Sequence, residues 1–387
     1  MSNTTIKLPN GRKIQLNNDS IEKYKENLNR LEPTLPIRDV WASPHIVVKN
    51  SYAELGHSFN SPGTTEEIRD NIDFDATIKI RKYLIKNGFA IAEAMDTAQR
   101  FFIGWTTAKK LIEETSQIPS DIKFIAGASY DNSSSSKDLD SICEAVIYQA
   151  NFIIACGGIP ILLPIPFLSN NNYSSDNYVK TYESLINRID SQLYIHWLGE
   201  MFLPELKGYF PGNSFEKIMA IDREKVLGVK LSLLNSSKEI SLRNKLSQFN
   251  QVVLSGDDFN FCNLIAGDEN GFSHALLGIF DAISLPAGIA LQFLANGKKE
   301  VFSSIMKPCE DLSRIIFESP TQHYKAGLAF LSWLDGHQEN NMIINRQDLC
   351  RSKAHYLSII EQASISNVFS NPEIAFERIL IWLESNY

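Results

Sequence analysis

The chain has 387 residues, of which 44% are hydrophobic and 21% charged, a composition that fits an ordinary globular protein and excludes a disordered or fibrous one. Its 37 lysine and arginine residues against 45 aspartate and glutamate residues give a formal net charge of -8. Because the sequence contains no dense basic run, we do not expect it to bind nucleic acid or an anionic membrane.

Two features indicate where the protein works. Residues 1–20 contain no apolar core of the signal-peptide type, and the most apolar stretch, 159–168, is about half a bilayer span and carries three prolines. The five cysteines are odd in number and widely spaced, which is typical of reduced thiols rather than disulfides or a zinc site. We therefore expect a cytoplasmic protein that does not span a membrane.

The chain opens with a polar leader, residues 1–37. Within it, the segment TIKLPNGRKIQL (5–16) has two short strand-like runs around Asn10-Gly11, a dipeptide that is typical of tight turns. We expect a small hairpin in this leader.

Between residues 38 and 300, short apolar runs alternate with longer helical patterns. Most of the short runs are apolar at nearly every position, as in strands that are buried on both faces of a parallel sheet. They occupy residues 39–48, 89–95, 123–129, 159–165, 192–198, 226–234, 251–256 and, more weakly, 271–277. Eight β/α units of this length predict a (β/α)8 TIM barrel. A doubly wound Rossmann sheet is the alternative, but no Gly-x-Gly-x-x-Gly motif follows the first run.

Residues 301–387 show helical patterns, which predict a C-terminal helical extension. This extension carries Phe330, Trp333 and Trp382. Large apolar side chains on an exposed extension indicate surface that another subunit buries, so we expect a homodimer or homotetramer.

The active site of a TIM barrel is built at the carboxyl ends of its strands, so polar residues at the end of each apolar run are candidates for the site. These residues are His45, Glu93, Asp96, Thr97, Asp131, His196, Glu200, Lys230, Gly256, Asp257 and Asp258.

Lys230 interrupts the apolar run VLGVKLSLL, where its side chain must point into the barrel or be buried at a high cost. Burial lowers the pKa of a lysine. A fall from about 10.4 to roughly 7–8 would make the amine a nucleophile near neutral pH, at a cost of about 4 kcal/mol. The alternative is a structural lysine paired with Asp257, Asp258 or Glu93.

His196 also interrupts an apolar run, QLYIHWL. By itself it reads as a core histidine with its hydrogen bonds satisfied. With His45, Asp96 and Glu200, or with Asp257, it could instead hold a divalent metal, because strand ends converge at one barrel mouth. No tight spacing motif supports a metal site.

Asp257 and Asp258 precede a helical pattern, FNFCNLIAG. For one of the two we expect only a structural role, as a helix cap or first-turn carboxylate that contributes about 1 kcal/mol.

The ordered set of fragments resembles the dihydrodipicolinate synthase/N-acetylneuraminate lyase superfamily of barrel aldolases, and more closely an uncharacterised branch of it. IDFDATIKIRKYLIKNG resembles the family's first helix, FIAGAS its third strand, VLGVK its Schiff-base strand, VLSGDD its seventh strand, and PTQHYKAGLAFL its helix with a proline followed by a lysine. The resemblance covers residues 40–336 and includes the spacing from Lys230 to Gly256.

Two departures from the family are informative. The family binds the carboxylate of an α-keto acid with Gly-Thr-Thr-Gly-Glu, where this chain has Met95-Asp96-Thr97-Ala98-Gln99. A carboxylate at Asp96 would repel such an acid, which makes pyruvate a poor substrate. His196 stands where the family has the tyrosine of its Tyr-Asn-x-Pro motif, and a histidine can take over acid–base work.

The resemblance implies a class I aldolase or lyase without a cofactor, in which Lys230 forms a Schiff base with a small carbonyl compound and His196 acts as base. Asp96 and Thr97 would bind hydroxyl groups of a sugar- or polyol-derived substrate, and His45, Glu200, Gly256, Asp257 and Asp258 would line the rim. Two alternatives stay open: a metal-dependent lyase or isomerase on the same barrel, and a sugar-binding barrel without catalysis.

Overall fold

The structure is a computed structural model that describes residues 5–120, 122–131 and 138–387. It contains two compact units. The first, here called the barrel unit, comprises residues 39–43 and 90–278. The second, here called the helical unit, comprises the residues up to 38 together with 44–89 and 279–387.

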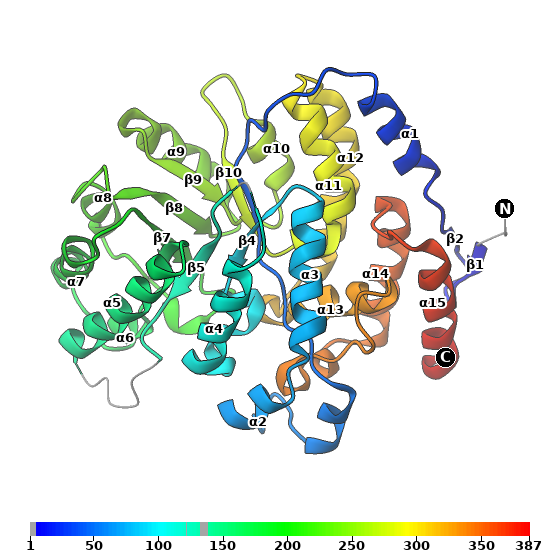
Figure 1. Cartoon of the computed structure of the whole chain (residues 1–387), viewed down its shortest axis with the longest axis horizontal. Coiled ribbons are helices and arrows are strands. Elements are labelled where there is room, and N and C mark those ends of the chain that lie inside the picture. The colour runs from blue at the N-terminus through cyan, green and yellow to red at the C-terminus, as the bar shows by residue number, and fades with distance from the viewer. Residues whose placement is uncertain (1–4, 121, 132–137) are drawn as a thin grey trace. The chain divides into compact units, whose positions relative to one another are not determined.

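All eight predicted strands are present in the barrel unit and form a closed parallel barrel (Figure 1). The strands are β3 (Val40–Ala42), β4 (Ala90–Glu93), β5 (Ile125–Ala128), β6 (Ile159–Leu162), β7 (Leu193–Leu198), β8 (Val226–Ser232), β9 (Val252–Ser255) and β10 (His274–Leu277). Each strand pairs with the next along the chain, and β10 pairs with β3 to close the barrel. The prediction of a TIM barrel is therefore confirmed.

The first strand is much shorter than the apolar run 39–48 from which it was predicted. β3 ends at Ala42, and Pro44 follows two residues later. Because proline lacks the N–H group that a ladder hydrogen bond needs, it does not continue an interior strand. The apolar residues Ile46, Val47 and Val48 are still buried, but as part of the helical unit.

Helices follow the strands of the barrel unit in the order expected for β/α repeats. They are α4 (Arg100–Ser116), α5 (Leu139–Ala155), α6 (Pro166–Asn170), α7 (Ser175–Arg188), α8 (Ser214–Met219), α9 (Ser236–Leu246) and α10 (Phe261–Ala266), with single turns η2 (Asp96–Ala98), η3 (Pro204–Leu206) and η4 (Ser247–Phe249). Asp138, Ser174 and Asn235 cap the first turns of α5, α7 and α9 with their side chains.

The helical unit begins with the hairpin β1 (Thr5–Lys7) and β2 (Lys13–Gln15), whose strands are antiparallel and flank Asn10 and Gly11. Its other elements are α1 (Asp19–Leu28), η1 (Asn50–Leu55), α2 (Thr65–Asp70), α3 (Phe74–Lys86), α11 (Phe280–Ala295), α12 (Lys299–Ile316), η5 (Thr321–His323), α13 (Lys325–Leu334), η6 (Ile344–Cys350), α14 (Lys353–Ser366) and α15 (Pro372–Asn386). In the chain, α3 follows β3 and α11 follows β10, so the two helices complete the eight β/α alternations.

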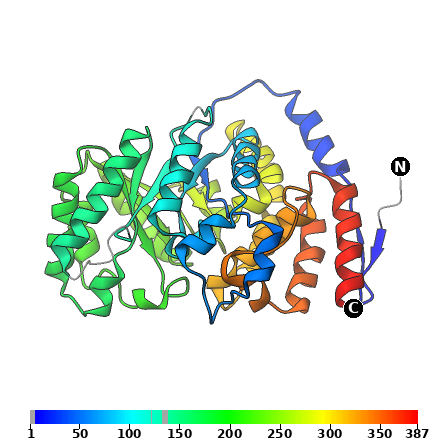
Figure 2. The same cartoon turned by 60° about the horizontal axis from the view of Figure 1, so that its bottom comes forward.

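Aromatic side chains join the last three helices of the helical unit. Phe330 of α13 packs with ring centroids 4.6 Å from Tyr356 of α14 and 5.6 Å from Trp382 of α15 (orange to red in Figure 2). Phe330 and Trp382 are buried within this unit. The chain itself covers these side chains, which corrects the reasoning that used them to predict a subunit interface.

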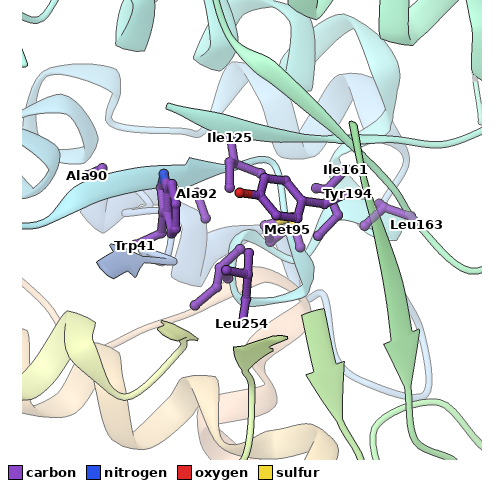
Figure 3. Packing of buried hydrophobic residues seen from close by; sticks show 10 residues of the cluster. Trp41, Ala90, Ala92, Met95, Ile125, Ile161, Leu163, Tyr194 and Leu254 are labelled. Carbon is purple, nitrogen blue, oxygen red and sulfur yellow. The ribbon is translucent and has the colours of Figure 1, made fainter. Parts of the chain in front are cut away.

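The barrel interior is filled by apolar side chains from most of its strands (Figure 3). The buried cluster contains Trp41, Ala90, Ala92, Met95, Ile125, Ile161, Leu163, Tyr194, Leu254 and Leu276.

Among the helices of the described ranges, none is long and apolar enough to cross a membrane.

Gly228 allows β8 to lie close to β9. A Cβ atom at residue 228 would lie 2.1 Å from the backbone oxygen of Val252, a contact that neither strand can relieve without moving. The packing of β8 against β9 thus requires glycine at this position, which lies two residues before Lys230 on the same strand.

We expect Gly228→Ala to lower the free energy of unfolding by at least about 3 kcal/mol, because overpacking against backbone costs more than the 1–3 kcal/mol typical of side chains. Chemical denaturation measures the change. Gly158→Ala is the matched control, since its new methyl group meets only the ring of Phe124, which is partly exposed and can turn aside. Equal losses in the two variants would contradict this account of Gly228.

Candidate functional site

Lys230 points into the barrel interior from β8. It lies in register with His196 on β7 and with Leu254 on β9, and Leu254 belongs to the interior cluster. Residues in register on neighbouring parallel strands point to the same side of the sheet. Lys230 and His196 therefore share the barrel interior, and both are almost fully buried, with exposures of 7% and 1%.

The position of Lys230 determines how readily its amine is protonated. Burial lowers its pKa from 10.5 to about 8, and the negative charges of Asp258 and then Asp96 oppose this change. Asp96 begins η2 after β4, and Asp258 follows β9, so both carboxylates belong to the mouth at the carboxyl ends of the strands. Near pH 7, an appreciable minority of the molecules carries a neutral amine in this position.

His196 is a neutral imidazole with one hydrogen-bond partner. Its Nε2 atom lies 3.3 Å from Oγ of Ser232, and its Nδ1 atom is buried without a partner among the described residues. Burial and then the charge of Lys230 hold the pKa of the ring well below its usual value of 6.5. The ring is therefore unprotonated across the physiological pH range.

Gly256 lets the backbone after β9 pass close to Ser232 and Lys230. A Cβ atom at residue 256 would lie 2.2 Å from Oγ of Ser232 and 3.2 Å from Cε of Lys230. The serine hydroxyl and the end of the lysine side chain thus lie beside the same backbone position, where any larger residue would collide with the hydroxyl.

The two consecutive aspartates have different surroundings. Oδ1 of Asp257 accepts hydrogen bonds from the backbone N–H groups of Phe259 at 3.0 Å and Asn260 at 3.1 Å, and the side-chain amide of Asn260 also donates to this carboxylate. Asp257 therefore shapes the turn that leads to α10, and it is Asp258 whose charge acts on Lys230.

Glu93, another predicted partner of Lys230, forms hydrogen bonds with other groups. Its carboxylate accepts hydrogen bonds from the N–H group of Ala94 at 2.9 Å and from the hydroxyl of Thr115 on α4 at 2.8 Å. Since Ala90 and Ala92 of the same strand face the interior, Glu93 faces the surrounding helices.

The remaining candidates, Thr97, Glu200 and His45, differ in burial and in the element that carries them. Thr97 is buried in η2, next to Asp96. Glu200 is exposed in the turn after β7. His45 belongs to the helical unit, where it is fully buried, with Nδ1 2.5 Å from Oδ2 of Asp281 and Nε2 2.6 Å from Oε1 of Gln338. The structure therefore brings Lys230, His196, Gly256, Asp258 and Asp96 together within the barrel unit and gives His45 a hydrogen-bonded core position of its own.

A charged residue with a fixed orientation, Asp131, also follows the third strand of the barrel. Asp131 forms an ion pair with Arg100, which is fully buried, and accepts a hydrogen bond of 2.8 Å from Nε2 of Gln149. Gln149 in turn accepts from the N–H group of Ser129 at 2.8 Å. Arg100 and Gln149 thus hold Asp131 in a fixed orientation.

Sequence reasoning missed two residues beside the site. Ser232 could have been found, because the period of a strand places 228, 230 and 232 on one face. Glu239 of α9 is buried and lies 3.2 Å from Oγ of Ser255, and burial raises the pKa of its carboxyl group to about 8. No pattern in the sequence of α9 marks this residue, which is one of several charged residues in that helix.

Within the described part of the chain, no three His, Cys, Asp or Glu side chains are arranged to hold a metal ion. The residues that a metal site would draw on have other surroundings: His45 contacts Asp281 and Gln338, and Glu200 is exposed.

Solved structures similar to this one share the barrel fold. A putative dihydrodipicolinate synthetase from Pseudomonas aeruginosa has a TM-score of 0.61 and 14% sequence identity, over 86% of this chain and 100% of that chain. Dihydrodipicolinate synthase from Oceanobacillus iheyensis has a TM-score of 0.59 and 14% identity, over 89% and 99% of the two chains. CdNal from Clostridium difficile, solved in complex with mannosamine, has a TM-score of 0.58 and 14% identity, over 87% and 100%.

Comparison with curated proteins gives no match. One family model, described as "Protein of unknown function (DUF993)", matches residues 6–386. The match extends over almost the whole sequence and includes every strand of the barrel. The barrel thus has the same fold as these solved structures, and the chain belongs to the DUF993 family.

Proposed function

We propose that this protein is a class I lyase or aldolase in which Lys230 forms a Schiff base with a small carbonyl compound. The observation that carries the proposal is the position of Lys230, whose amine is buried in the barrel interior with a pKa lowered to about 8. Lysines that act as nucleophiles require such a lowered pKa. The likeness of the barrel to those of dihydrodipicolinate synthases supports the same chemistry.

The reaction begins when the neutral amine attacks the carbonyl carbon, and loss of water then gives an iminium ion. The positive nitrogen withdraws electrons from the neighbouring carbon–carbon or carbon–oxygen bond, which can then break. A base must take up the proton that this cleavage releases. His196 is the base in our proposal, because its ring is neutral and lies in register with Lys230.

The charges near Lys230 favour a neutral substrate. Asp258 and Asp96 both act on the lysine through their negative charge. A keto acid would bring a third carboxylate to this mouth, whereas the hydroxyl groups of a sugar- or polyol-derived carbonyl compound can donate hydrogen bonds to Asp96. Thr97 next to it offers a hydroxyl group for the same purpose. The complex of CdNal with mannosamine, a sugar, is consistent with a similar barrel accepting such molecules.

Lys230 is tested by trapping. We expect 2,4-pentanedione to condense with Lys230 into a stable, ultraviolet-absorbing enaminone, and dihydroxyacetone with borohydride to add its reduced fragment to the peptide that contains Lys230. The rate should rise with pH and level off above about pH 8, since only the neutral amine attacks. Lys230→Arg should abolish the reaction, because a guanidinium does not become a neutral nucleophile.

Mass spectrometry of the peptide identifies the modified residue, and circular dichroism checks the fold of the variant. Lys325 is the internal control, because it is a second buried lysine of the same chain. Modification at Lys325 instead of Lys230, or an Arg variant that still turns over substrate and loses activity to a chelator, would contradict the Schiff-base proposal and favour the metal-dependent one.

Removing a neighbouring carboxylate should make Lys230 easier to deprotonate. Asp258 raises the pKa of Lys230, so Asp258→Asn should shift the midpoint of the pH–rate profile with 2,4-pentanedione below 8, by about one unit. Asp257→Asn is the matched control, because an asparagine oxygen can still accept the hydrogen bonds of the turn. A shift in the control as large as that in Asp258→Asn would refute the assignment of Asp258.

Asp96 should select against acidic substrates. We expect dihydroxyacetone to trap the wild-type protein faster than pyruvate does. In Asp96→Asn, the ratio of these two trapping rates should fall about tenfold, because one repulsive charge near the substrate has been removed. The two rates are measured at the same amine protonation, on the plateau of each pH profile. An unchanged ratio would remove Asp96 from the determinants of specificity.

A further inference from the structure

The hydrogen bond of His196 Nε2 leads to a hydroxyl group next to Lys230 on the same strand. Among the described residues, the partner of this atom is Oγ of Ser232, at 3.3 Å. A proton that moves between Nε2 and the reacting atoms can therefore cross the serine hydroxyl. Hydroxyl groups can do this, because they donate one hydrogen bond while accepting another.

Ser232 is placed to pass a proton on. It lies two residues after Lys230 on β8, so both side chains point to the same face of the strand. A Cβ atom added at Gly256 would lie 2.2 Å from Oγ of Ser232 and 3.2 Å from Cε of Lys230, so the hydroxyl lies near the end of the lysine side chain. Ser232 is 2% exposed, so bulk water does not replace its hydroxyl as the proton carrier.

We propose that Ser232 is a catalytic residue, the group through which His196 exchanges protons with the nitrogen and oxygen of the Lys230 adduct. This inference rests on the proposed function, since it assigns a proton path to the formation of that Schiff base.

The proton balance follows from the atoms present. The amine attacks the carbonyl carbon, an N–C bond forms, and the carbonyl oxygen takes one proton from a water molecule at the barrel mouth, which leaves to bulk solvent as a hydroxide ion. The nitrogen, now carrying two protons and a positive charge, gives one to Oγ of Ser232 while Ser232 passes its own proton to Nε2 of His196. The imidazolium then returns this proton through Ser232 to the hydroxyl of the adduct, the C–O bond breaks, and water leaves as the nitrogen lone pair forms the C=N bond.

The buried position of His196 suits the second half of this cycle. A ring whose protonated form is disfavoured by burial gives its proton back readily, so it is a strong acid at the moment when the hydroxyl must leave. Ser232 is neutral before and after each transfer, so no unpaired charge is left on a buried hydroxyl group.

The experiment measures enaminone formation between Lys230 and 2,4-pentanedione in Ser232→Ala. We expect a rate at least tenfold below wild type, with the pH midpoint still near 8, because a neutral hydroxyl contributes to proton transfer and not to the charge around Lys230. Ser214→Ala is the matched control: Ser214 is also fully buried in the barrel unit, on α8, and its hydroxyl has no hydrogen-bond partner among the described residues. The control should react at the wild-type rate.

A second variant keeps the inference falsifiable if Ser232→Ala does not fold. His196→Asn should slow the reaction to a similar extent, and the double variant should be no slower than either single one, because residues of one relay lose their effect together. Equal rates in wild type, Ser232→Ala and His196→Asn would overturn the relay. Failure of the wild-type protein to form any enaminone at Lys230 would instead overturn the proposed function itself.

Discussion

A lysine amine inside an apolar barrel can take up a proton only at the expense of the fold. Lowering the pKa of Lys230 from 10.5 to about 8 corresponds to about 3 kcal/mol. Because folding lowers this pKa, the cost is absent above the unfolded value of 10.5. The free energy of unfolding then decreases as the pH falls from 10.5 through about 8. The protein therefore carries the full cost at neutral pH. Such a cost is acceptable only where a large core supplies the surplus, which the closed layer of apolar side chains beneath Lys230 does.

The groups around Lys230 limit this cost without removing it. Asp258 and Asp96 oppose the lowering of the pKa, and a further negative charge would cancel the effect. Glu239, one layer behind β9, avoids this because burial raises its pKa to about 8 and keeps the group mostly neutral at pH 7. Its contact with Ser255 holds the strand that leads to Asp257 and Asp258. A neutral acid thus supports the rim while leaving the charge balance of the amine to the two aspartates.

The parts of the fold that repeat along the chain were visible in the sequence, and the parts that depend on distant pairings were not. Eight apolar runs at regular spacing predict a barrel, and a lysine within such a run predicts Lys230, because both signals are local. The environment of His45 is not local: its partners, Asp281 and Gln338, lie more than 200 residues away in the chain. The strand period places Ser232 on the same face as Lys230, but its contacts with His196 and Gly256 depend on the register with β7 and β9, which the sequence does not show.

In the proposed mechanism, the same two carboxylates change their effect when the Schiff base forms. In the free protein, Asp258 and Asp96 favour the ammonium form of Lys230 and so reduce the fraction of reactive amine. The iminium ion, in contrast, must keep its positive charge to withdraw electrons from the substrate, and it lies in the same buried place. Preorganised charges of opposite sign stabilise such a developing cation far more in a water-excluded site than in water. On this proposal, each aspartate slightly slows the attack of the amine, because it favours the ammonium form, and lowers the barrier to the dehydration that follows, because it stabilises the cation that dehydration produces.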